Sequence, residues 1–154
     1  MSAVSPLPAY LFSDMEEEDL PQVLAIDAEA YEFPWSRRIF LDCLEAGYHC
    51  RVFKQWQTIL AYGVMSVAAS EAHILNLCVR PAYQRRGLGR RMLAHLLDIA
   101  RREGAEIVLL EARISNKVAI HLYTRMGFRE VGMRKNYYPS RGGREDAVVL
   151  MRSF

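Results

Sequence analysis

The chain has 154 residues, of which 51% are hydrophobic and 25% are charged, and its formal net charge is +2. This size and composition predict a single globular domain over residues 1–154 and exclude a disordered chain or a strongly basic nucleic-acid-binding protein. The sequence has three cysteines without metal or redox spacing, and it shows no signal peptide and no apolar run of bilayer length. These features predict a cytoplasmic protein without membrane contact.

The first third of the chain predicts one short strand followed by two helices. Residues 1–8 contain two prolines and are expected to form a poorly ordered lead-in, and residues 10–12 are expected to form the strand. Residues 16–30 predict a helix with acidic residues in its first turn, where the helix dipole favours them. Ser36 is a typical N-cap for a second helix, which Gly47 ends.

The rest of the chain alternates between strand-like and helical patterns. Three strands are expected at residues 49–54, 58–69 and 72–79, followed by a helix at 87–103 and an apolar strand at 107–112. A helix capped by Asn116 is expected at residues 116–127, and two closing strands at 128–133 and 147–151. The closing strands are expected to be joined through residues 137–143. The predicted order is βααβββαβαββ, an α/β fold whose mixed sheet has about seven strands and helices on both faces.

Residues 84–90, with the sequence Gln-Arg-Arg-Gly-Leu-Gly-Arg, lie between an apolar strand and an apolar helix. A helix N-terminus presents unpaired backbone N–H groups, and two glycines allow an anion to approach that backbone closely. Arginines at such a terminus are unfavourable unless an anion binds there. The Walker and dinucleotide-binding patterns are absent. The segment predicts a phosphate-binding loop; the alternative is a helix with a basic first turn.

The arrangement Gln-x-x-Gly-x-Gly after a strand resembles the acyl-CoA pyrophosphate loop of the GNAT family of N-acetyltransferases. The predicted order of elements is similar to the fold of that family along nearly the whole chain. The resemblance implies acetyl-CoA as co-substrate. Acetyl transfer to an amine requires a base for the ammonium proton, donors for the thioester oxyanion and stabilisation of the leaving thiolate.

Glu111 closes the apolar strand expected at residues 107–112. Ligand sites of open α/β sheets lie beyond the carboxyl ends of strands, where partial burial makes a carboxylate a better proton acceptor. Glu111 is therefore a candidate general base. The alternative is a polar strand end that faces solvent or pairs with Arg113.

Asn116 and Tyr123 are separated by almost two turns of the next predicted helix, so both project from one face roughly 10 Å apart. A linear ligand such as the pantetheine arm of coenzyme A would meet the amide first and the hydroxyl at its reactive end. Because a tyrosine has a pKa of ~10 and a thiol of ~8.5, Tyr123 is expected to stabilise the thiolate by a hydrogen bond rather than deliver its proton outright. The alternative is a core aromatic beside a simple helix cap.

Four further segments resemble the RimI subfamily, whose members acetylate the N-terminal alanine of a small-subunit ribosomal protein. These segments are residues 33–36, 110–116, 119–123 and 136–147. The resemblance implies a peptide α-N-acetyltransferase that transfers directly within a ternary complex. The implied partner is the N-terminus of such a ribosomal protein, without direct nucleic-acid contact, and the chain is expected to be a monomer or weak oligomer.

The resemblance also implies roles for individual residues. Glu111 would be the general base and Tyr123 the general acid, and a bulge near Cys78 would turn an N–H group toward the thioester oxygen. The residues implied to bind the cofactor are Leu77, Cys78, Val79, Arg85, Arg86, Gly87, Leu88, Gly89, Arg90 and Asn116. Candidates to line the acceptor groove, each of which would equally suit core or surface packing, are Tyr31, Phe33, Trp35, Arg134, Tyr137 and Tyr138.

Several alternatives remain open from the sequence. The chain would also suit an acetyltransferase for a small amine or a lysine side chain, or a CoA-sensing or ribosome-binding module without catalysis. An RNA-binding role for the arginine cluster predicts steep salt dependence. Cys78 lacks a sequence-adjacent histidine that would activate it as an acyl-carrying nucleophile. No metal site is expected, because the four histidines, His49, His73, His95 and His121, lack ligand spacing.

Overall fold

The structure is a computed structural model that describes residues 10–154. The lead-in expected at residues 1–8 lies outside the described residues and stays a prediction. Within residues 10–154, no helix combines the length and the apolar character needed to cross a lipid bilayer.

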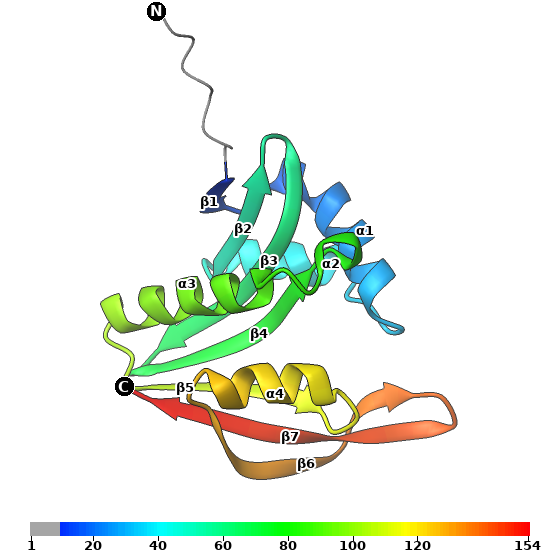
Figure 1. The fold of residues 1–154 in the computed structure, drawn as a ribbon, viewed down its shortest axis with the longest axis vertical. Helices are drawn as coiled ribbons and strands as arrows, with labels where there is room; N and C mark the ends of the chain where they lie inside the picture. The colour runs from blue at the N-terminus through cyan, green and yellow to red at the C-terminus, as the bar shows by residue number, and fades with distance from the viewer. Residues whose placement is uncertain (1–9) are drawn as a thin grey trace, which may run out of the picture.

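A seven-stranded mixed sheet with the order β1-β2-β3-β4-β5-β7-β6 forms the centre of the molecule (Figure 1). Only β4 and β5 pair in parallel, and every other neighbouring pair is antiparallel. The predicted element order and strand number are confirmed. The strands are β1 (Tyr10–Asp14), β2 (His49–Gln55), β3 (Thr58–Ala68), β4 (Glu71–Val79), β5 (Ile107–Arg113), β6 (Arg129–Ser140) and β7 (Gly143–Ser153).

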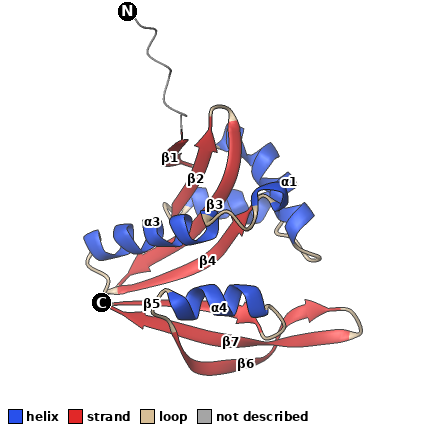
Figure 2. Ribbon diagram, viewed as in Figure 1, coloured by secondary structure: helices blue, strands red, loops and turns tan. Residues whose placement is uncertain are grey.

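Helices cover both faces of the sheet (Figure 2). One core cluster joins α1 and α2 to β2 and β3, and the other joins α3 and α4 to the opposite face. The predicted caps are confirmed: Ser36 accepts a hydrogen bond from the N–H of Ile39, and Asn116 from that of Ala119. The helices are α1 (Leu20–Ala30), α2 (Arg37–Glu45), α3 (Leu88–Arg102) and α4 (Lys117–Arg125), with 3₁₀ turns at Glu17–Asp19 and Pro81–Tyr83.

The last two strands are longer than predicted. β6 continues to Ser140 and β7 begins at Gly143, so residues 137–139 belong to a strand and not to a connection. Two irregularities hide this from the sequence pattern, because each breaks the alternation of faces along β6. The larger one lies between Arg134 and Tyr138, where Asn136 adopts a left-handed conformation with φ of 53°.

The sheet opens between β4 and β5. Their parallel pairing runs only from Glu71 and Ile107 to Ile74 and Leu110, and beyond this point the two strands share no ladder. The register between β3 and β4 shifts at the same level and leaves Leu75 as an extra residue. The bulge expected near Cys78 therefore lies three residues earlier in the chain, where β4 turns away from β5. This splay creates the space in which the candidate site lies.

Candidate active site

Two pockets meet at the splay between β4 and β5. The first, of about 360 Å³, lies between the α1–α2 connection, β5 and the far part of β6. The second, of about 560 Å³, lies between the segment at residues 84–90, the end of β4 and α4. The residues that line both pockets are Tyr31, Leu77, Asn116, Ala119 and Tyr123. A ligand that enters from one side can thus meet a ligand that enters from the other.

The segment at residues 84–90 leaves a row of backbone donors free. Gly87 is the N-cap of α3 in a left-handed conformation with φ of 77°, which few residues other than glycine adopt. Arg91 is the first residue of the helix whose N–H bonds back, to the carbonyl of Gly87 at 3.1 Å. Within the described chain, no group accepts a hydrogen bond from the N–H groups of residues 85–90. Such a cluster of donors at a helix N-terminus suits a diphosphate.

Most residues predicted to bind the cofactor line the second pocket. The exception is Arg86, whose guanidinium lies over the ring of Tyr83, 5.3 Å from its centroid. The predicted residues in the wall are Leu77, Cys78, Val79, Arg85, Gly87, Leu88, Gly89, Arg90 and Asn116. Gln84, the first residue of the predicted loop, lies in the same wall, and the residues there that sequence reasoning missed include Val118, His121 and Arg125. These three are spaced by three and four residues from one another along the predicted helix, which was the signal available for them.

Along β4, the backbone N–H and carbonyl groups of every second residue point into the splay. The N–H of Arg80 bonds to the carbonyl of Leu60 on β3, and in an antiparallel ladder residues of the same parity point the same way. Cys78 therefore uses its N–H and carbonyl toward β3, whereas those of Leu77 and Val79 face the open side. The carbonyl of Leu77 there accepts a hydrogen bond of 2.9 Å from the Tyr31 hydroxyl. The N–H groups of Leu77 and Val79 are the donors best placed for a thioester oxygen.

Glu111 lies in the wall of the first pocket with 6% of its side chain exposed. One carboxylate oxygen, Oε2, lies 2.7 Å from Nε2 of His73 on β4. The other, Oε1, lies 3.5 Å from Nε of Arg134 on β6. The pairing with Arg113 that the sequence left open is not formed, because Arg113 bonds to Glu145 at 3.0 Å. Sequence reasoning set His73 aside, and only the β4–β5 register brings it to the carboxylate.

Tyr123 stands where the two pockets join. Its hydroxyl has no hydrogen-bond partner among the described residues. Burial raises the pKa of Tyr123 to about 12, with a smaller contribution from nearby Cys78. Such a hydroxyl stays protonated across the physiological range, so it is a hydrogen-bond donor and a weak acid. This favours hydrogen bonding to a leaving thiolate over complete proton transfer.

The aromatic residues predicted to line the acceptor groove fall into two groups. Tyr31, Phe33, Trp35 and Tyr138 line the first pocket. Tyr137 is absent from that wall and packs edge-on against Tyr138, with ring centroids 4.9 Å apart. Arg134, predicted with this set, is also outside the wall but borders it through its contact with Glu111.

Asp27, near the end of α1, connects three parts of this pocket and was missed by sequence reasoning. Its carboxylate is 1% exposed and accepts hydrogen bonds from the N–H of Trp35 at 2.7 Å and from Nδ2 of Asn76 at 3.2 Å. The hydroxyl of Tyr62 donates to it as well. The aromatic wall and the segment that follows the β4 bulge are thus tied to one buried carboxylate.

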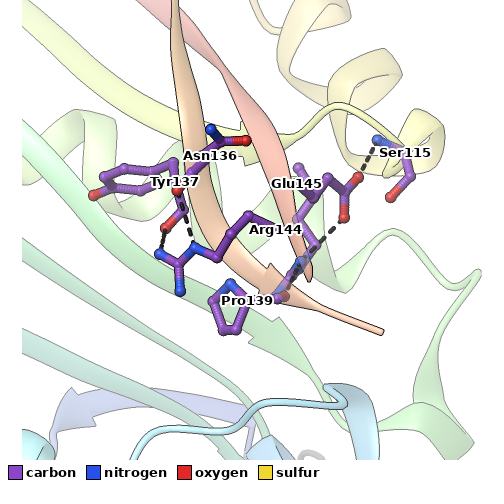
Figure 3. Close-up of polar contacts among 7 residues, drawn as sticks. Ser115, Asn136, Tyr137, Pro139, Arg144 and Glu145 are labelled. Atoms are coloured by element: carbon purple, nitrogen blue, oxygen red, sulfur yellow. Dashed lines mark hydrogen bonds and ion pairs between the residues drawn. The ribbon is translucent and has the colours of Figure 1, made fainter. Parts of the chain in front are cut away.

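The charged residues of the segment at 143–147 hold the irregular end of β6 (Figure 3). The Arg144 guanidinium donates to the carbonyls of Asn136 and Tyr137 at 3.1 and 3.0 Å. Glu145 accepts hydrogen bonds from Arg113 and from the N–H of Ser115, as Figure 3 shows for Ser115. These contacts fix the β6–β7 arm against the loop that follows β5, and so place Tyr138 in the pocket wall.

Cys78 is a buried thiol and not an exposed nucleophile. Burial raises the pKa of Cys78 to about 12, so the thiolate needed for acyl transfer is scarce near pH 7. Its Sγ lies 3.8 Å from the carbonyl of Val79. Among residues 10–154, no group of three His, Cys, Asp or Glu side chains is arranged to hold a metal ion.

Comparison with known proteins gives concordant matches. Residues 11–128 match the acetyltransferase (GNAT) family. The chain is 40% identical over 138 residues to the ribosomal protein bS18-alanine N-acetyltransferase of Escherichia coli strain K12, covering 90% of this chain and 93% of that protein. It is 33% identical to the Haemophilus ducreyi protein of the same name, covering 87% and 93%. The crystal structure of the ribosomal-protein-S18-alanine N-acetyltransferase from Escherichia coli matches with a TM-score of 0.87 at 38% identity, covering 94% and 93%.

Proposed function

This chain belongs to the GNAT family of acetyltransferases, and we propose that it acetylates the α-amino group of the N-terminal alanine of ribosomal protein bS18. Members of this family use acetyl-CoA as the acetyl donor. Relatives that share 33–40% identity over most of the chain carry the name of this bS18 activity. The observation that carries the proposal is that Tyr123 lines two pockets at once, with Glu111 in the wall of the first.

The second pocket is the proposed site for acetyl-CoA. The free N–H groups of residues 85–90 and the guanidinium groups of Arg85 and Arg90 suit the diphosphate. Asn116 lies further along the same pocket, where the pantetheine arm would pass. Arg86 is left out of this set because it faces Tyr83.

The first pocket is the proposed site for the acceptor amine. Glu111 would take the ammonium proton, and the amine would then attack the thioester carbonyl. The N–H groups of Leu77 and Val79 would hold the oxyanion, and Tyr123 would donate a hydrogen bond to the departing sulfur. Overall, the ammonium loses two protons; one ends on the CoA thiol and one passes to solvent. No covalent acetyl-enzyme is needed, in agreement with the buried state of Cys78.

An α-amine is a more suitable acceptor than a lysine for a single carboxylate base. The pKa of an α-amino group is ~8 and that of lysine ~10.4, so removing the proton costs about 3.3 kcal/mol less at neutral pH. A pocket of about 360 Å³ walled by Tyr31, Phe33 and Trp35 suits a small first residue followed by extended peptide. Because the substrate is a ribosomal protein, we place the reaction in the cytoplasm, with the chain acting as a monomer or weak oligomer that makes no direct nucleic-acid contact.

The direct test uses the purified protein with acetyl-CoA and three acceptors: a peptide with the bS18 N-terminus, an N-blocked lysine peptide and a polyamine. We expect thiol release and a mass gain on the α-amine of the first peptide alone. Faster transfer to the lysine peptide or polyamine would favour the small-amine or lysine alternative. No turnover despite tight acetyl-CoA binding would favour a non-catalytic module.

Two variants test the roles of the residues. Glu111→Gln should lower kcat on the order of 10²-fold or more. Its thermal stabilisation by coenzyme A should persist, because Glu111 lies in the other pocket. Glu103→Gln, at the far end of α3, is the matched control and should retain wild-type kcat. Wild-type turnover by Glu111→Gln would rule out this carboxylate as the base.

A further inference from the structure

The proposed base is bonded to a histidine that the acetylation scheme above does not use. His73 Nε2 lies 2.7 Å from Glu111 Oε2, and the exposed fractions of the two side chains are 35% and 6%. The two residues are 38 positions apart and meet because β4 and β5 pair in parallel with His73 opposite Leu109. The contact lies in the last paired part of the two strands, next to the splay.

The hydrogen bond has a defined direction when Glu111 is ready to act. An ionised carboxylate only accepts hydrogen bonds, so Nε2 of His73 must carry the hydrogen. This bond occupies Oε2, while Oε1 faces Arg134 at a longer 3.5 Å. The imidazole therefore restricts the rotation of the carboxylate and leaves Oε1 as the freer oxygen for the ammonium proton.

The same contact makes the charge around Glu111 depend on pH. Histidine is the side chain that ordinarily changes charge between pH 5 and 8. The side chain of His73 is 35% exposed, so it can exchange a proton with solvent. Two groups from β6 face Glu111: Arg134 contacts its carboxylate, and Tyr138 lies near enough that the charge of Glu111 adds to burial in raising the pKa of its hydroxyl. Glu71 precedes His73 on the same face of β4, and opposite His73 in the ladders stand the uncharged Ser66 and Leu109. Protonation of His73 would add a second cation beside the carboxylate, which makes that carboxylate a weaker proton acceptor.

We propose that His73 is a positioning residue for acetyl transfer: it orients Glu111 through the Nε2–Oε2 hydrogen bond, and its protonation lowers the activity at acid pH. The inference rests on the proposed function, since it requires Glu111 to act as the base. It makes the acid limb of the pH–rate profile a property of the pair and not of Glu111 alone.

Two substitutions separate orientation from charge. In His73→Gln, the amide nitrogen is as many bonds from Cβ as Nε2 is, so a donor to Oε2 remains but cannot become a cation. In His73→Leu, both the donor and the charge are lost. His49→Gln is the matched control, because His49 also pairs with a glutamate, Glu103, at 3.0 Å, and neither residue lines either of the two pockets of the candidate site.

The experiment measures kcat and the KM for each substrate, the alanine peptide and acetyl-CoA, with the other at saturation, between about pH 5.5 and 8.5. We expect His73→Gln to retain kcat within about threefold near pH 7.5 and to shift the acid limb by about one unit to lower pH. His73→Leu should lower kcat about tenfold near pH 7.5, and by a smaller factor at acid pH because the inhibiting charge is absent as well, with KM for acetyl-CoA unchanged. His49→Gln should overlay the wild-type profile.

Two results would overturn the inference. One is a wild-type acid limb in His73→Gln, and the other is a wild-type kcat in His73→Leu. A loss of thermal stability in His73→Leu without either kinetic change would assign His73 a purely structural role. Glu111→Gln, measured in parallel, distinguishes the two levels of the argument: if it is inactive while His73→Gln behaves as wild type, the proposed function stands and the role of His73 fails.

Discussion

Replacing Asp27 with alanine should destabilise the protein and weaken the acceptor pocket together. Asp27 is 1% exposed and accepts hydrogen bonds from Trp35, Tyr62 and Asn76. Hydrogen bonds to a charged group contribute about 1.5–3 kcal/mol each, and the alanine variant escapes the cost of burying the carboxylate. The expected net loss is about 3–5 kcal/mol, because buried donors are left without an acceptor. At about 2–4 °C per kcal/mol for a chain of this size, Tm should fall by roughly 6–20 °C.

Urea denaturation followed by fluorescence measures the loss of stability, and steady-state kinetics measure the pocket. Because Trp35 and Asn76 line the first pocket, KM for the alanine peptide should rise more than KM for acetyl-CoA. Glu29→Ala, an exposed change on the same helix, is the control and should alter stability by less than about 0.5 kcal/mol. A loss below about 1 kcal/mol in Asp27→Ala would show that the three hydrogen bonds do not hold this wall together.

Three further outcomes are expected. Cys78→Ala should retain kcat within about threefold, because a thiol with a pKa of about 12 is protonated near pH 7. If the wild-type protein showed ping-pong kinetics and this variant did not, direct transfer would be contradicted. Tyr123→Phe should lower kcat on the order of 10²-fold with little change in the dissociation constant of acetyl-CoA from calorimetry, and an unchanged kcat would remove the hydroxyl from the mechanism. Burial and Arg51 lower the pKa of His95 in the folded protein. The contribution of neutral His95 to stability is therefore complete above the pKa of ~6.5 that histidine has in the unfolded chain, and it is lost as the pH falls toward the lower pKa of the folded state. His95→Phe, which retains a ring against Phe12, should flatten this part of the pH dependence of the urea midpoint, and an identical slope in both proteins would contradict it.

The local chemistry of several residues is readable from the sequence. Ser36 and Asn116 cap helices because their side chains accept the free N–H groups of a first helical turn, a requirement set within a few residues. The glycine and arginine pattern at residues 84–90 likewise specifies a helix N-terminus open to an anion. Apolar periodicity fixed the order of elements because it records which face of each element is buried.

The tertiary structure alone decided how distant residues meet. His73 and Arg134 reach Glu111 from two other strands, and Asp27 reaches Trp35 and Asn76 across the interior. The position of the β4 bulge at Leu75 and the irregular course of β6 depend on pairing register. The sequence of one strand carries no information about which residues of its partner it will pair with. The sequence thus determined the helices, strands and backbone donors of this protein, whereas strand register determined where the sheet opens and which residues surround Glu111. The physical reason is that capping and periodicity act within one element, while register is set by the packing of all of them.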